Sequence, residues 1–150
     1  MNLSERCNYL EITLNKPVLD NNYKTRVVFD STKAQLVEDS NSPETGYFAL
    51  DIYKDNICLT QVQGGVETVI YGRSESSKRV IKDILKTSDY IEEGENAALK
   101  ISTQKVGDYV VCVVKINDKA AINTMCRAHN SEETGFWGVC SQKAPLELTY

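Results

Sequence analysis

The sequence has 150 residues, of which 41% are hydrophobic and 25% charged, and its formal charge is −4. A chain of this length suits one domain with its own core, spanning residues 1–150, and its composition is ordinary for a soluble globular protein. The absence of clustered Lys and Arg argues against nucleic acid as a partner, and no apolar run reaches the roughly 18–20 residues of a membrane span.

The five cysteines are the unusual feature of the composition. An odd number leaves at least one thiol unpaired within the chain, and Cys58, Cys112 and Cys140 occupy strand-like runs where cysteine acts as a small apolar residue. Such usage is typical of a reducing compartment. No signal peptide is visible, so localisation stays open between the cytoplasm and secretion within a larger protein. Zinc held by Cys126, His129 and Cys140 is an alternative, although the spacing lacks a second tight ligand pair.

Alternation of apolar and polar residues predicts that most of the chain forms β-strands. Runs of Asp, Asn, Gly and Pro separate these strands, because such residues favour chain reversal. In chain order, the predicted strands before the C-terminal region are Asn8–Leu14, Tyr23–Asp30, Ala34–Asp39, Gly46–Tyr53, Asn56–Val62, Glu67–Tyr71 and Asn96–Gln104.

The clearest β signal lies between Asp108 and Thr149, which predicts a hairpin, a loop and a second hairpin. Its first strand alternates between two sides, with Val110, Cys112, Val114 and Ile116 on one side and Tyr109, Val111, Val113 and Lys115 on the other. Asn117-Asp118 then supplies the two-residue turn that a right-twisted hairpin favours. Trp137 has the same parity as Val139, so we expect it to be buried.

One segment departs from this alternation. In residues 76–90 the apolar residues occur as Val80-Ile81 and Ile84-Leu85, which is helical spacing. A serine at its start could cap the helix. The segment therefore predicts a helix of two to three turns across one end of a sheet. The whole chain predicts an all-β, two-sheet antiparallel sandwich with one short helix.

A short motif occurs twice, as NSPETGYFAL at residues 41–50 and as NSEETGFWGV at residues 130–139. Each copy reads as a polar loop, a glycine that admits a close backbone, and a strand led by an aromatic residue. The repeat is too short for a solenoid array. It predicts two strands in similar positions of the sandwich.

Three stretches together resemble the concanavalin A-like lectin/glucanase superfamily: ETGYFALDIYKDNICLTQV, ENAALKISTQKVGDYVVCVVKINDKAAINT and ETGFWGVCSQKAPLEL. Within it, the chain is similar to modules attached to glycosidases and to laminin G-type domains. The resemblance covers roughly residues 23–149. It implies a jelly-roll sandwich that binds an oligo- or polysaccharide, as an accessory module beside a catalytic domain in a longer chain.

Catalytic members of that superfamily carry paired carboxylates on one strand. Here the acidic clusters Glu38-Asp39, Glu92-Glu93 and Glu132-Glu133 fall at strand ends or in loops, so no two carboxyls are predicted to point into one groove. His129 is the only histidine and is expected on the surface of a polar loop. The sequence thus favours a protein that is not an enzyme, with a diverged glycoside hydrolase as an alternative.

The strand Gly46–Tyr53 offers a binding surface. If Phe48 and its even-numbered neighbours face the core, then Tyr47, Asp51 and Tyr53 face outward. Two flat rings around a carboxylate suit a sugar, because rings stack on C–H faces and the carboxylate accepts hydrogen bonds from hydroxyls. The alternative is that one tyrosine packs beneath a loop and Asp51 pairs with a lysine.

Two further residues complete the candidate set. Phe136 would share the outward side if its strand lies in the same sheet, and Arg73, beside Glu75, could reach a ligand at the rim. The candidate ligand-binding residues are Tyr47, Asp51, Tyr53, Phe136 and Arg73.

No cofactor is predicted. Structural calcium, held by oxygen ligands from Asp20–Asn22, Asp30 or Glu38-Asp39, is an alternative without a recognisable loop signature. The alternative function from another class is a structural or protein-interaction module that binds no sugar and presents an apolar patch.

Overall fold

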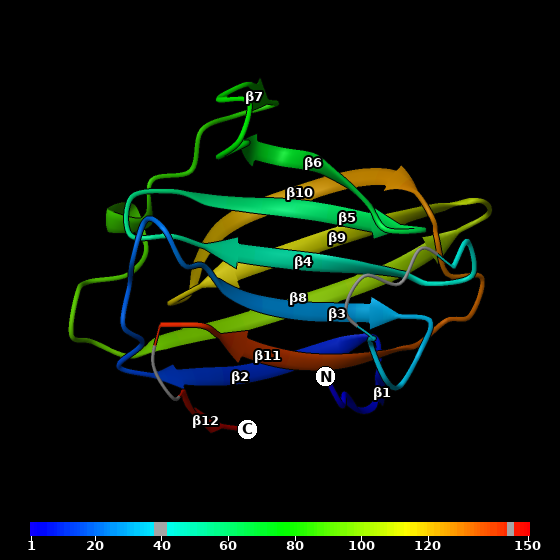
Figure 1. Ribbon diagram of the computed structural model, residues 1–150, viewed down its shortest axis with the longest axis horizontal. Coiled ribbons are helices and arrows are strands. Elements are labelled where there is room, and N and C mark those ends of the chain that lie inside the picture. Colours follow the sequence, from blue (N-terminus) through cyan, green and yellow to red (C-terminus); the bar gives the residue numbers. More distant parts are fainter. Residues whose placement is uncertain (38–41, 144–145) are drawn as a thin grey trace.

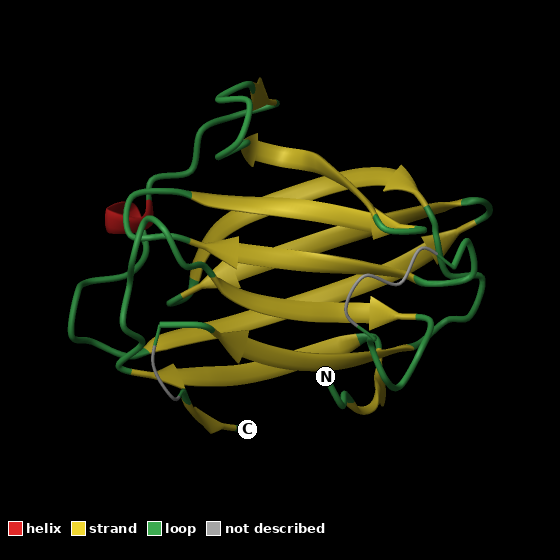
Figure 2. Ribbon diagram, viewed as in Figure 1, coloured by secondary structure: helices red, strands yellow, loops and turns green. Residues whose placement is uncertain are grey.

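Two antiparallel sheets lie face to face in the computed structural model, which describes residues 1–37, 42–143 and 146–150 (Figure 1, Figure 2). The larger sheet contains, in spatial order, β1 (Ser4–Cys7), β11 (Gly135–Ser141), β3 (Thr25–Ser31), β4 (Gly46–Ile52), β5 (Ile57–Gln63), β6 (Val66–Arg73) and β7 (Val80–Ile81). The smaller sheet contains β10 (Lys119–Arg127), β9 (Tyr109–Ile116), β8 (Ala97–Val106), β2 (Tyr9–Asn15) and β12 (Glu147–Thr149). The predicted two-sheet sandwich is confirmed.

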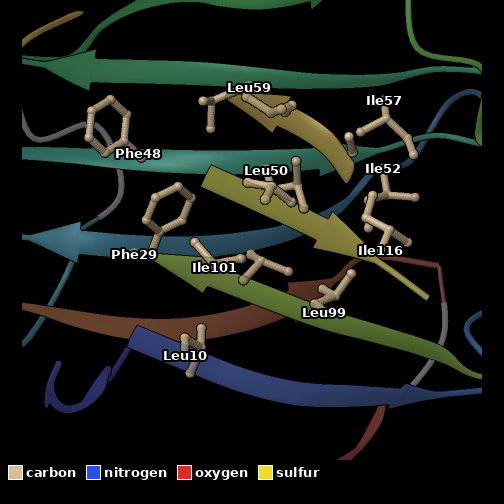
Figure 3. Packing of buried hydrophobic residues seen from close by; sticks show 14 of the residues in the cluster. Leu10, Phe29, Phe48, Leu50, Ile52, Ile57, Leu59, Leu99, Ile101 and Ile116 are labelled. Carbon is tan, nitrogen blue, oxygen red and sulfur yellow. The ribbon is translucent and has the colours of Figure 1, made fainter. Parts of the chain in front are cut away.

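The core fills the space between the sheets because the strands alternate as predicted. Phe48 and Leu50 of β4 face Leu99 and Ile101 of β8, all almost fully buried (Figure 3). The Phe48 ring stacks on Phe29 with centroids 5.4 Å apart. Each such side chain contributes about 1.5–3 kcal/mol through burial.

The predicted inward position of Trp137 is confirmed, since the side chain belongs to this core and is 6% exposed. Its neighbours along β11 therefore occupy the outer face of the larger sheet, where any ligand-binding surface on that sheet must lie.

The first predicted C-terminal hairpin is confirmed. Strands β9 and β10 pair along their length around Asn117 and Asp118, whose φ angles of 50° and 64° match the left-handed turn that this hairpin requires. The Asn117 side chain also donates to the Tyr90 carbonyl and accepts from the Ala98 amide. The turn thus ties two neighbouring segments to the sheet end.

The second predicted hairpin is wrong. Strand β11 pairs with β1 and β3 in the larger sheet, whereas β12 pairs with β2 in the smaller one. The chain crosses between the sheets after Ser141 instead of turning back. Alternation identifies which face a residue takes, but it carries no information about which strand becomes its neighbour.

The predicted helix over residues 76–90 is also wrong. Only a 3₁₀ turn, η1 (Thr87–Asp89), is present. It is preceded by β7 and by a connecting segment, residues 82–86. Lys78 and Lys82 have φ angles of 61° and 69°, which are incompatible with a right-handed helix. Leu85 of this segment pairs with Ile57, and the hydroxyl of Thr87, the first residue of η1, donates a hydrogen bond to the Tyr53 carbonyl. The Lys82 ammonium also donates to the Thr124 hydroxyl of β10 in the smaller sheet, and these contacts with both sheets outweigh the local helical spacing. The described residues include no helix long and apolar enough to span a membrane.

The strand predicted at Ala34–Asp39 is not formed in its described part, residues 34–37. Gln35 makes a single isolated bridge to Asn2, and the remaining predicted residues lie outside the described ones.

The two copies of the repeated motif begin β4 and β11, which flank β3 on either side in one sheet (Figure 1). The predicted similarity of their positions is confirmed. Both glycines are sterically required: a Cβ atom on Gly135 would lie 2.5 Å from the Asp30 backbone, and one on Gly46 would lie 2.9 Å from the His129 side chain. The close approach at Gly135 coincides with a bulge in β3, where Asp30 has a φ of 52°.

Candidate functional site

An open depression of about 710 Å³ lies on the outer face of the larger sheet. It crosses the strands from Lys24 beside β3, over Asp51 and Thr60, to Glu67 on β6. The loop from Ser74 to Arg79, between β6 and β7, forms its far wall. The remaining lining residues are Asn21, Asn22, Tyr53, Cys58, Thr68, Val69 and Ile81. Hydroxyl, amide and charged groups outnumber apolar ones around it.

A bonded group of three charged side chains organises its floor. Arg26 donates from Nε and Nη2 to the two Asp51 oxygens at 2.7 and 2.9 Å, and Nη2 also donates to Glu67 Oε1 at 2.9 Å. The Thr60 hydroxyl donates to Asp51 at 3.1 Å. Burial lowers the pKa of Arg26, but its bonds to Asp51 and Glu67 outweigh burial and raise this pKa overall. The group is therefore charged and rigid before any ligand arrives.

Asp51 is on the outward side, as predicted, but the expectation that it is exposed is wrong. It is 2% exposed because the Arg26 guanidinium covers it. The alternative in which Asp51 pairs with a basic residue is the observed one. Arg26 is its main partner, and the Lys24 ammonium lies farther away, at 3.9 Å.

Tyr53 and Tyr47 are both half-buried. Tyr53 lines the depression; burial and the nearby Asp51 carboxylate raise the pKa of its hydroxyl. Tyr47 lies in one cross-strand row with Val62 and Glu67. Burial raises the pKa of Tyr47, although the Arg26 guanidinium opposes this. Both phenols are therefore protonated at neutral pH and can donate hydrogen bonds.

The other two candidate residues lie apart from the depression. Phe136 is in the same sheet as Tyr47, as predicted, but Arg6 lies over its ring, 5.0 Å from the centroid. Arg73 donates from Nη2 to Glu75 at 3.2 Å, and its buried Nε has no hydrogen-bond partner among the described residues. Of the five candidates, Asp51 and Tyr53 line the depression, and Tyr47, Phe136 and Arg73 do not.

The residues predicted from the sequence do not include Lys24, Arg26, Thr60 and Glu67. Arg26 lies at an outward position of a predicted strand, and that was the one available signal. Its importance comes from Asp51 on the neighbouring strand and from Glu67 two strands further, and only the strand order makes these residues neighbours.

Two carboxylates in one depression raise the question of glycoside hydrolysis. Asp51 and Glu67 each accept from the same Arg26 nitrogen at 2.9 Å, so their oxygens are separated by no more than about twice that distance. Hydrolysis needs one carboxylic acid that stays protonated. Burial raises the pKa of Glu67, but Arg26 and Lys24 lower it further, and the net pKa is below its usual value. Glu67 is therefore ionised and unsuited to donate a proton.

A second polar cluster lies at the opposite end of β4, around the buried Asp30 carboxylate. Lys105 donates to both Asp30 oxygens at 2.8 and 2.9 Å, and Asn130 donates at 3.0 Å. The third Lys105 proton bonds the Glu132 carbonyl at 3.0 Å. Because all three ammonium protons are used, this cluster holds the β3 bulge against β8 and offers no free donor from Lys105.

The expectation that His129 lies on the surface is wrong. Its side chain is 0% exposed and packs edge-on against Phe48. Its Nε2 lies 2.8 Å from the Asp30 carbonyl, which can only accept, and Nδ1 lies 2.9 Å from the Gln61 amide nitrogen. Both ring nitrogens are therefore occupied, which leaves neither for zinc. Among the described residues, no group of three or more His, Cys, Asp or Glu side chains could hold a metal ion.

His129 is expected to make folding pH-dependent. Burial lowers the pKa of His129, although Asp30 opposes this, and the nearby Lys105 ammonium adds to the lowering. The unfolded chain takes up a proton near pH 6.5, and the folded chain does so only at lower pH. The stability due to neutral His129 is thus complete above that pH and is lost below it.

The measurement is urea unfolding of the wild type and the H129Q variant between pH 7.5 and 5. The loss of unfolding free energy caused by H129Q should be largest at pH 7.5 and shrink with acidification, by at most about 1.4 kcal/mol per pH unit. A difference that stays constant across this range would contradict the assignment.

Comparison with known proteins gives little further guidance. Neither a protein-family model nor a curated protein matches the sequence. Among solved structures, the chain is similar to a carbohydrate binding module, CBM66, from Bacillus subtilis, with a TM-score of 0.49 and 14% identity. The match covers 91% of this chain and 68% of that chain. At this level of likeness the function has to be argued from the site itself.

Proposed function

We propose that the protein is a non-catalytic carbohydrate-binding module of the concanavalin A-like, jelly-roll type, a single domain belonging to a longer glycan-active protein. The depression lined by Asp51 and Tyr53 is its binding site. The observation that carries this proposal is the lining: fixed polar groups around one half-buried aromatic ring on a rigid sheet.

The chemistry of the lining favours a sugar over other small molecules. Pockets for drug-sized ligands and cofactors are mostly apolar with a few polar groups. This depression has the opposite balance, with hydroxyls of Thr60, Thr68 and the Ser74–Ser77 loop and side-chain amides of Asn21 and Asn22. A polyhydroxylated ligand can exchange its water for such donors and acceptors, while Tyr53 supplies a flat face for its C–H groups.

The ionised state of Glu67 favours binding over catalysis. Arg26 holds the pKa of Glu67 below its usual value and fixes the positions of both carboxyl groups, so Glu67 is ionised and cannot serve as the general acid. Binding of this kind would hold a neighbouring catalytic domain close to its polysaccharide.

A second candidate function is supported by the outer face of the smaller sheet. Three apolar side chains are about half exposed there: Val106 at 53%, Tyr109 at 47% and Met125 at 55%. Val106 pairs with Tyr109, and Met125 pairs with Val111, so they form one patch at a corner of the sheet. Such a patch suits packing against another domain. A structural or protein-interaction module is therefore the alternative.

The test is a glycan-array screen that includes neutral and acidic oligosaccharides, followed by calorimetry with the strongest ligand. The Y53A variant should weaken binding about tenfold, equivalent to about 1.4 kcal/mol, because the stacking surface is removed. The matched control is Y109A, a tyrosine of similar size on the opposite outer face, which should leave affinity unchanged.

Two outcomes would contradict this assignment. A screen without any ligand at high protein concentration would argue against carbohydrate binding and favour the packing module. A detected affinity that Y109A removes and Y53A leaves intact would move the site to the smaller sheet.

A further inference from the structure

We propose that the glycan bound in this depression is acidic, an oligosaccharide that carries carboxylate or sulfate groups on more than one sugar. This inference rests on the proposed function and specifies its ligand class. It follows from the charges around the depression and from the partners that each charge already has.

The carboxylates of the depression are all neutralised by side chains of the protein. Asp51 and Glu67 share Arg26, at 2.7–2.9 Å. Glu75 accepts from Arg73 at 3.2 Å and from Lys78 at 3.0 Å. The acidic groups that line the site therefore do not present free negative charge to a ligand.

Two cations that line the depression, Lys24 and Arg79, make no side-chain hydrogen bond among the described residues. The Lys24 ammonium is 31% exposed and lies 3.9 Å from Asp51, beyond hydrogen-bond distance. Arg79 is exposed, and among the described residues its guanidinium makes no ion pair and no hydrogen bond. The charged side chains that line the depression are thus three carboxylates, each of which accepts a hydrogen bond from a cation of the protein, and two cations that make no such bond among the described residues. Lys24 and Arg79 are therefore the charged groups of the lining that remain available to an anionic ligand.

The positions of Lys24 and Arg79 favour an oligosaccharide as the ligand. Lys24 precedes β3 and Arg79 precedes β7, so three strands of the sheet lie between them. Adjacent strands are about 4.8 Å apart, so the two backbone positions are about 15–20 Å apart, and the Lys24 ammonium reaches inward to within 3.9 Å of Asp51 on β4. An oligosaccharide with acidic groups on more than one sugar has the length to contact both cations.

The experiment compares acidic oligosaccharides with the carboxyl-reduced or desulfated form of the same molecules, by calorimetry in 50 and 300 mM NaCl. The acidic form should bind at least tenfold more tightly, and its affinity should fall with salt. K24Q and R79Q should each weaken its binding about fivefold and reduce the salt dependence. K115Q, on the outer face of the smaller sheet, is the matched control and should change nothing. Thermal melting checks that every variant is folded.

The possible failures are distinguishable. If the neutral forms bind as tightly as the acidic ones, the acidic specificity is wrong and carbohydrate binding stands. If polyglutamate of equal charge binds as tightly with the same dependence on Lys24 and Arg79, the surface recognises charge alone and the inference is overturned. If no oligosaccharide of either form binds, the proposed function fails together with it.

Discussion

Replacing Lys105 with Met is expected to lower the free energy of unfolding by about 3–5 kcal/mol, because it leaves a buried carboxylate without its cation. The Asp30 side chain is 0% exposed and accepts both of its short ionic contacts from the Lys105 ammonium. Asn130 and His129 supply hydrogen-bonding contacts to Asp30 but no full positive charge at neutral pH. Urea denaturation followed by circular dichroism at pH 7.5 measures the loss.

The matched control lies on the same strand. K100M removes an ammonium whose partner, Asp118, is exposed, so its effect should be far smaller than that of K105M. If K105M does not fold alone, the double variant D30N/K105M should restore folding, since it removes the unpaired charge as well. Equal costs for K105M and K100M would show that the Asp30 contact does not stabilise the fold.

Replacing Gly135 with Ala is expected to cost about 3 kcal/mol, the upper range for forcing atoms into a packed interior. The added Cβ would lie 2.5 Å from Cα and C of Asp30, and the β3 backbone cannot move without disturbing the bulge and the Lys105 contact. Thermal and urea unfolding of the purified variant measure this cost.

Gly138 provides the control within the same strand. There the nearest atom is Leu3 Cδ2 at 2.6 Å, followed by Met1 Cε at 3.1 Å, and both are ends of flexible side chains that can rotate away. G138A should therefore cost less than about 1 kcal/mol, since side-chain repacking is cheaper than backbone displacement. If the two variants lose the same stability, the backbone contact at Asp30 is not what requires a glycine at position 135.

Local patterns predicted the strands well. The alternation along Val110–Ile116 and the Asn117-Asp118 turn both appear as expected, because side-chain direction and turn geometry depend on neighbouring residues in the chain. The repeated Thr-Gly-aromatic motif likewise identified two equivalent strands and both crowded glycines. Residues 76–90 do not follow their local pattern, since their helical spacing is overridden by bonds to both sheets.

The candidate site was predicted only in part. Tyr53 and Asp51 were recognised from parity along one strand, but the covering of Asp51 by Arg26 was not, because that contact joins residues 25 positions apart. The same holds for His129, whose polar sequence neighbours suggest a surface loop. Its burial comes from Asp30, Phe48 and Gln61, which are distant in sequence.

The sequence by itself determined the all-β class, which side of most strands is buried, and the two glycines that leave no room for a Cβ atom. These properties depend on short-range sterics and on the two-residue period of a strand. Only the tertiary structure decided which strands are neighbours, and with that which charges meet. Asp51, Arg26 and Glu67 form one group because β3, β4, β5 and β6 are consecutive in the sheet. Lys24 and Arg79 likewise line one depression only in that arrangement.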